Sequence, residues 1–225
     1  MGMFWQFFAL DRSQWDELFG GGHPNAEKLV IAAATWHRDE NLDLDFDETR
    51  LDEYLDTLER RAPEQTKRIA RKICADGVSY AGLSDAEAAE LDHMIVGWFC
   101  PEGLETHLGY RYAHRCGLSA KAIAELLRCA RPGLMARLRG AGRALPQLSA
   151  FEKGRRFGQA APPQEAAPYV VFTAEEASEA LSEWDRLMEG PAGSSMGFRQ
   201  HLEDELITGL RAAVAERQWF AARHT

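Results

Sequence analysis

The sequence predicts a predominantly helical α+β protein with one small sheet. Apolar residues recur at helical spacing over most of the 225 residues, whereas only two short segments have the aromatic and β-branched composition typical of strands. Hydrophobic residues make up 45% and charged residues 27% of the chain, a balance typical of a globular protein that buries a core. We therefore expect a single α+β domain over residues 1–225.

Both expected strands lead directly into a helix. The first strand spans residues 4–10 and the second spans residues 169–172. A polar residue caps the helix after the first strand, and Thr173 with Glu176 forms a capping box after the second. Because both segments repeat the order of aromatic strand, cap and Trp-containing helix, we expect the two strands to lie in one sheet, as neighbours.

The remaining elements are expected to be helices. Ser84 with Glu87 forms another capping box, and Ser119 can cap the helix that follows it. Residues 140–168 are rich in Gly, Pro, Ala and Gln, which is typical of a long surface loop or connector. Apolar periodicity places helices at residues 26–38, 48–61, 119–130 and 198–217, and others after Pro63 and Ser84.

Charge and composition exclude several classes of function. The formal charge of −9 argues against general nucleic-acid binding, which needs Lys and Arg for the phosphates. No stretch approaches the ~20 apolar residues that span a bilayer, so we expect no membrane segment. The four cysteines form no C-x-x-C pair and no secretory signal is evident, which indicates a cytoplasmic protein with reduced thiols.

The charges are unevenly distributed along the chain. Residues 1–60 contain 14 acidic and 5 basic residues, whereas residues 121–156 contain 9 basic and 2 acidic residues. The basic segment could bind a phosphate group, or it could pair with acids of its own fold.

The most unusual segment is the acidic stretch at residues 39–48. Three of its aspartates alternate with leucine and phenylalanine, so an extended backbone would place the carboxylates on one side. A calcium loop is disfavoured because the required Gly and final Glu are missing. The segment is either an acidic recognition edge for a basic partner or a solvated loop that stabilises the start of the next helix. Its carboxylates are Asp39, Glu40, Asp43, Asp45, Asp47 and Glu48.

Three further residues are candidates for a ligand pocket, namely Trp36, His37 and Glu203. His37 lies in an apolar stripe, where it is either a pocket residue or a hydrogen-bonded core histidine. Glu203 falls within the apolar arc of the last expected helix, where a carboxylate needs an Arg partner, a donor network or a raised pKa. We expect no metal site and no cofactor, because glycines and prolines interrupt the seven-residue repeat of His93, Cys100, His107 and His114.

Two segments resemble uncharacterised bacterial proteins. The opening Met-Gly-Met, the strand ending Phe8-Ala9-Leu10-Asp11 and the helix with Trp15 and Leu18 resemble the YfbM-like family. The segment Tyr169-Val-Val-Phe-Thr-Ala-Glu-Glu looks like a strand followed by an acidic-capped helix near the end of related proteins. The resemblance implies a small α+β bacterial protein and supplies no catalytic residue.

Two classes of function follow from these observations. We expect a non-catalytic acidic binding protein, namely a bacterial immunity protein that binds and neutralises a basic toxin domain through the acidic stretch. The alternative is a small-molecule-binding protein or enzyme whose tryptophan-lined pocket contains Glu203 or His37. The sequence has no G-x-S-x-G, P-loop or H-E-x-x-H motif, which favours the non-catalytic class, and we assign no catalytic residue.

Overall fold

The computed structural model describes most of the chain as two compact units. The sheet unit comprises residues 1–10 and 112–225, and the helical unit comprises residues 11–111. The α+β class is confirmed, while the expectation of a single domain stays a prediction. The described residues are 4–10, 12–38, 51–98, 115–130, 145–152, 154–157, 169–189 and 197–224.

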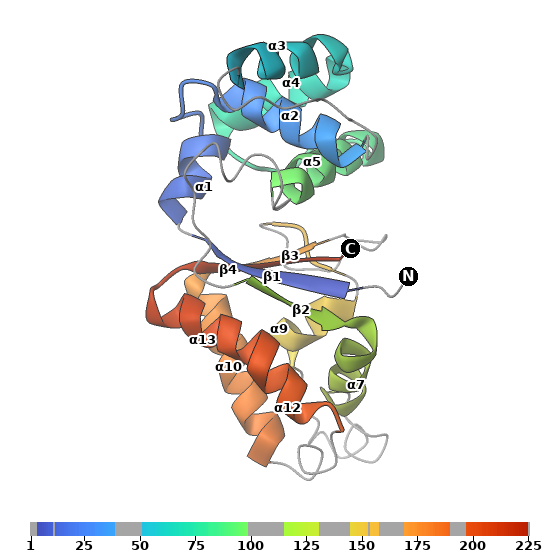
Figure 1. Ribbon diagram of the computed structural model, residues 1–225, viewed down its shortest axis with the longest axis vertical. Helices are drawn as coiled ribbons and strands as arrows, with labels where there is room; N and C mark the ends of the chain where they lie inside the picture. The colour runs from blue at the N-terminus through green and yellow to red at the C-terminus, as the bar shows by residue number, and fades with distance from the viewer. Residues whose placement is uncertain are drawn as a thin grey trace. The chain divides into compact units, whose positions relative to one another are not determined.

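The described residues of the sheet unit form a four-stranded sheet in the order β2-β1-β4-β3, and each adjacent pair is antiparallel (Figure 1). The chain's first and last strands are therefore central neighbours, with Trp5 opposite His224 and Leu10 opposite Trp219. The strands are β1 (Phe4–Leu10), β2 (Arg115–Ser119), β3 (Tyr169–Phe172) and β4 (Trp219–His224).

The sequence predicted β1 and β3 correctly as members of one sheet, but their expected adjacency is wrong. β4 lies between them, and neither β4 nor β2 was predicted. β2 contains Gly117 and opens with Arg115, and β4 contains two consecutive alanines, so neither has the composition of a strand. Pairing with β1 defines both segments, and this long-range contact leaves no signal in local composition.

Helices of the sheet unit cover one face of the sheet (Figure 1). The last three elements form one continuous helix, of which the middle turn is a π-helix. The elements are α7 (Ala120–Ala130), α9 (Pro146–Ser149), the 3₁₀ turn η2 (Ala150–Glu152), α10 (Ala174–Glu189), α12 (Arg199–Leu202), the π turn η3 (Glu203–Ile207) and α13 (Thr208–Ala215).

An aromatic core joins these helices to the sheet. Phe7 of β1 is fully buried, stacks on Phe220 with ring centroids 5.6 Å apart and meets the edge of Phe151 at 6.1 Å. Phe151 and Leu148 lie within the segment predicted as a long surface loop, yet both are buried. The prediction of a loop over residues 140–168 is therefore wrong for residues 145–152, because spaced apolar residues give α9 and η2 a face to bury.

The helical unit is organised around α2. Residues 29–34 of this helix are each at most 1% exposed, so its middle is buried on all sides. A Cβ atom at Gly97 would lie 2.0 Å from the backbone oxygen of Ala33, so glycine permits the close approach of α5 to α2. The helices are α1 (Arg12–Phe19), α2 (Ala26–Arg38), α3 (Leu51–Arg61), α4 (Glu64–Asp76) and α5 (Asp85–Trp98).

Candidate functional site

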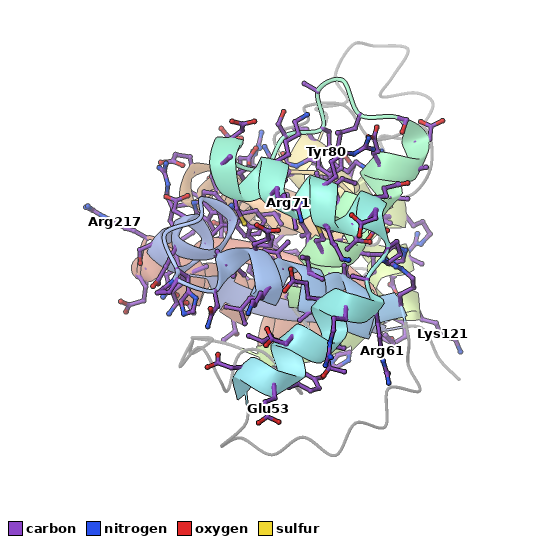
Figure 2. The ribbon with its side chains drawn as sticks, turned by 90° about the horizontal axis from the view of Figure 1, so that it is seen from above. Glu53, Arg61, Arg71, Tyr80, Lys121 and Arg217 are labelled. Atoms are coloured by element: carbon purple, nitrogen blue, oxygen red, sulfur yellow. The ribbon has the colours of Figure 1, made fainter. Side chains whose placement is uncertain are left out.

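The exposed surface of α3 carries the acidic site that the structure describes best. Glu53 and Asp56 are exposed, Glu59 is half-buried, and Glu53 projects away from the ribbon (Figure 2). Together with Thr57 and Arg60 they line an open hollow. The spacing of three and six residues places all three carboxylates on one side of the helix, while Leu55 and Leu58 are fully buried.

One cation from α2 reaches this surface. Lys28 Nζ donates to Asp56 Oδ1 at 2.5 Å, and this hydrogen bond raises the pKa of Lys28 above its ordinary value. The side chain of Asp56 remains 52% exposed despite the contact. The lining of the hollow therefore contains three carboxylates and the cation Arg60, and Lys28 contacts one of the three carboxylates.

The excess of acid extends over the helical unit. Residues 11–111 include 22 acidic and 11 basic residues, a formal charge of −11, whereas the sheet unit has 13 acidic and 15 basic residues, a charge of +2. Even if every base of the helical unit paired with one acid, eleven acids would have no cation of that unit to meet.

Many bases of the helical unit are already used in pairs on its own surface. The basic helix α4 supplies three of them, and α2 supplies a fourth from Arg38 to Glu90, beside the buried hydroxyl of Thr66. The α4 pairs are Lys67–Glu64 at 2.8 Å, Arg68–Glu87 at 2.5 Å and Arg71–Glu27 at 2.9 Å. Three of the four bases of α4 are therefore paired with acids of the same unit.

The predicted acidic edge lies outside the described residues, but α3 follows it directly in the sequence. Asp39, Glu40, Asp43, Asp45, Asp47 and Glu48 all fall in the segment 39–50. The acids of α3 were not among the predicted site residues, although their helical spacing opposite an apolar stripe was a usable signal. The interpretation of residues 39–48 as a recognition edge stays a prediction.

The alternative of a tryptophan-lined pocket gains no support from the described side chains. Trp36 and His37 lie on α2, but their side chains are outside the described residues. Trp15 is 3% exposed and packs on Phe19 in the helical unit, with ring centroids 4.4 Å apart. Trp184 is 1% exposed and belongs to the core of the sheet unit. These two tryptophans therefore serve two different cores.

Glu203 does not occupy the apolar arc in which helical projection placed it. It opens the π turn η3, its side chain is 28% exposed, and Arg199 Nη2 lies 3.8 Å from its carboxylate. The prediction fails because a π turn inserts one extra residue, which rotates Glu203 relative to Leu210 by about 100° from the α-helical expectation. The ion pair that the sequence left open for Glu203 is the arrangement observed.

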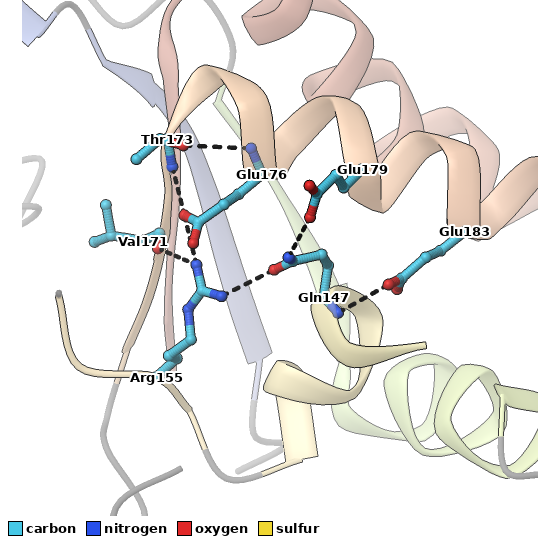
Figure 3. Close-up of polar contacts among 7 residues, drawn as sticks. All are labelled: Gln147, Arg155, Val171, Thr173, Glu176, Glu179 and Glu183. Atoms are coloured by element: carbon cyan, nitrogen blue, oxygen red, sulfur yellow. Dashed lines mark hydrogen bonds and ion pairs between the residues drawn. The ribbon is translucent and has the colours of Figure 1, made fainter. Parts of the chain in front are cut away.

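A second polar cluster lies in the sheet unit around Arg155 (Figure 3). The guanidinium donates to Gln147 Oε1 at 2.8 Å and to the backbone oxygen of Val171 at 3.1 Å, and it pairs with Glu176 at 2.6 Å. It also lies 4.9 Å from the ring centre of Phe172. Arg155 belongs to the predicted basic segment, so here that segment pairs with acids of its own fold.

Glu183 completes this cluster from the next turns of α10. It is 2% exposed and accepts the backbone N–H groups of Gln147 at 3.1 Å and Leu148 at 2.9 Å. Gln147 Nε2 also donates to Glu179 at 2.7 Å. Burial raises the pKa of Glu183, while the two backbone hydrogen bonds oppose the shift. Because these groups satisfy one another, the cluster holds α9 and β3 against α10.

The described residues show neither a metal-binding group nor a helix that could span a membrane. Among the described residues, His, Cys, Asp and Glu form no group of three that could hold a metal ion. Of the predicted seven-residue repeat, His93 lies on α5, and the other three members fall outside the described ranges. None of the helices in the described part of the chain has the length and apolar content needed to cross a membrane.

Comparisons of the chain with protein-family models, with curated proteins and with solved structures give no match. The resemblance to the YfbM-like family therefore stays a prediction, and no functional residue is transferred from another protein. Among the described residues, the acidic surface of α3 is the site that bears on function, whereas the Arg155 cluster holds elements of the sheet unit together.

Proposed function

We propose that the protein is a non-catalytic binding protein whose helical unit recognises a basic protein surface, and that it serves as a bacterial immunity protein against a toxin. The observation that carries this proposal is the formal charge of −11 on residues 11–111, set against +2 on the sheet unit. Charge of one sign on one unit steers the approach of an oppositely charged partner and suppresses the approach of others.

The surface of α3 supports the same proposal. Glu53, Asp56 and Glu59 line an open hollow, which offers carboxylates to Lys or Arg side chains of a partner. The acidic segment 39–48, which precedes this helix in the sequence, adds six carboxylates to the charge of the unit. Lys and Arg side chains are the usual contacts of proteins to nucleic-acid phosphates, so an acidic protein could cover and block a toxin that acts on nucleic acid.

Capture from the native host tests the proposal. The bait is the full chain, and the comparison is the triple variant Glu53→Gln, Asp56→Asn and Glu59→Gln. A matched control neutralises three exposed acids of the sheet unit, namely Asp185→Asn, Glu189→Gln and Glu216→Gln. We expect a basic protein that is retained by the wild type and the control, is lost from the α3 variant and is eluted by salt.

Growth then distinguishes an immunity protein from other binding proteins. Expression of the captured protein alone should arrest a bacterial host, and co-expression of the full chain should restore growth. A captured protein that is harmless would remove the immunity function, and equal capture by the α3 variant would remove the acidic interface.

A further inference from the structure

In the sequence, the helical unit lies between β1 and β2, which are neighbouring strands of the sheet. β1 and β2 are antiparallel, with Phe4 opposite Ser119 and Phe8 opposite Arg115. Neighbouring antiparallel strands are ordinarily joined by a hairpin loop of about 2–5 residues. Here the connection leaves β1 after Leu10, contains the whole helical unit and returns to β2 at Arg115. The unit thus occupies the position of a hairpin loop.

The sheet unit closes a core from its own residues. Its hydrophobic cluster draws on Phe7 from β1 and on residues between 122 and 222, and it includes Trp184 and Leu210. Its central strands β1 and β4 pair along six residues, from Trp5 to Leu10. The core and the strand pairing of the sheet unit therefore involve its own residues, including the two strand ends that flank the helical unit.

The helical unit likewise has buried residues and polar contacts of its own. Leu29 on α2, Leu55 on α3 and Leu91 on α5 are each fully buried. Tyr80 donates its hydroxyl proton to Asp92 Oδ1 at 2.6 Å, and both residues are less than 9% exposed. Its length of 101 residues is that of a typical domain.

From this topology we infer that residues 11–111 are an inserted module that folds and unfolds independently of the sheet unit. Insertions are tolerated at hairpin connections because both ends of the insert meet the host at one place. The inference also assigns recognition of the basic partner to the inserted module, and this part rests on the function proposed above. The sheet unit is then the domain that carries the module.

Native-state hydrogen exchange on the full chain tests the inference. Leu29→Ala weakens the core of the helical unit, and Leu210→Ala weakens that of the sheet unit; both side chains are fully buried. We expect each substitution to raise the exchange rates of the most protected amides in its own unit by about 30-fold or more, since such truncations are strongly destabilising. The rates in the other unit should change by less than about 3-fold.

Milder substitutions keep the test valid if an alanine variant fails to fold. Ile73→Val in α4 and Ile123→Val in α7 each remove one methylene from a side chain that is at most 3% exposed. Exchange in the same unit should rise about 2-fold to 10-fold. If either substitution raises the rates equally in both units, the chain is one cooperative domain and the inference is wrong. The assay needs no partner, so its outcome is independent of the binding experiments.

Discussion

The two units use similar numbers of charged residues in different ways. In the sheet unit, Glu183 is 2% exposed and the side chain of Arg155 is 14% exposed, so both lie inside the fold. In the helical unit, pairs such as Arg68–Glu87 lie on the surface, where the arginine is 67% exposed. Buried charges such as Glu183 and Arg155 thus hold elements of the sheet unit together, whereas we propose that the net surface charge of the helical unit sets the field that a partner would meet.

The largest effect should come from Glu183→Ala. The substitution leaves the backbone N–H groups of Gln147 and Leu148 buried without their acceptor, so we expect the free energy of unfolding to fall by about 2–4 kcal/mol. Chemical denaturation measures the loss. Glu189→Ala on the same helix is the control, because Glu189 is exposed and its removal should cost less than about 0.5 kcal/mol. Equal losses would show that Glu183 does not hold α9.

The second prediction compares the loss of stability when one arginine is replaced in each unit. Arg155→Gln removes contacts to Gln147, Val171 and Glu176, and should lower the free energy of unfolding by about 2–3 kcal/mol. Arg68→Gln breaks an exposed pair and should cost less than about 1 kcal/mol. Similar losses for both substitutions in thermal or chemical denaturation would abolish the contrast between the units.

A smaller effect, of opposite sign, is expected at the end of α13. Arg217 adopts φ +54°, and the N–H groups of Arg217 and Gln218 donate to the carbonyls of Val214 and Ala213. This is a Schellman motif whose left-handed position favours glycine. Arg217→Gly should raise the free energy of unfolding by up to about 1 kcal/mol. Arg217→Ala keeps the unfavourable φ and should bring no gain, so a gain from both would locate the effect in the side chain.

The smallest expected effect is on how the free energy of unfolding changes with pH, which should have opposite signs for two glutamates. Burial raises the pKa of Glu183 in the folded protein above its ordinary value of 4.5. The contribution of this shift to the free energy of unfolding is therefore fully present below pH 4.5, and it is lost as the pH rises through the raised pKa. Hydrogen bonds from Ser84 lower the pKa of Glu87, so its contribution is present above pH 4.5 and is lost as the pH falls. Free energies of unfolding measured against pH for Glu183→Gln and Glu87→Gln should deviate from the wild type in opposite directions. Deviations of one sign would contradict these assignments.

Local features of the fold could be predicted from the sequence. The capping box of Thr173 and Glu176 is confirmed, with N–H donation at 2.9 and 3.3 Å, and so is that of Ser84 and Glu87. Ser119 also accepts from the N–H of Ala122, as expected for a helix cap. Each of these contacts spans three residues, so the information lies within one window of sequence.

The remaining features depend on contacts between distant residues. Glu183 meets α9 across 35 and 36 residues, and Arg155 meets Val171 across 16, so neither partner can be read from spacing. The predicted position of Glu203 was wrong because α-helical spacing was assumed through residues that form a π turn. The acids of α3 were overlooked because the neighbouring segment 39–48 has a denser run of carboxylates.

The association rate of the captured partner tests the central claim most directly. The claim predicts that the α3 variant Glu53→Gln, Asp56→Asn and Glu59→Gln associates about 3-fold to 10-fold more slowly at low salt, with a weaker salt dependence. The sheet-unit variant Asp185→Asn, Glu189→Gln and Glu216→Gln has the same net charge and should associate at nearly the wild-type rate. Equal slowing of both variants would mean that net charge alone governs the encounter, and it would contradict a recognition surface on the helical unit.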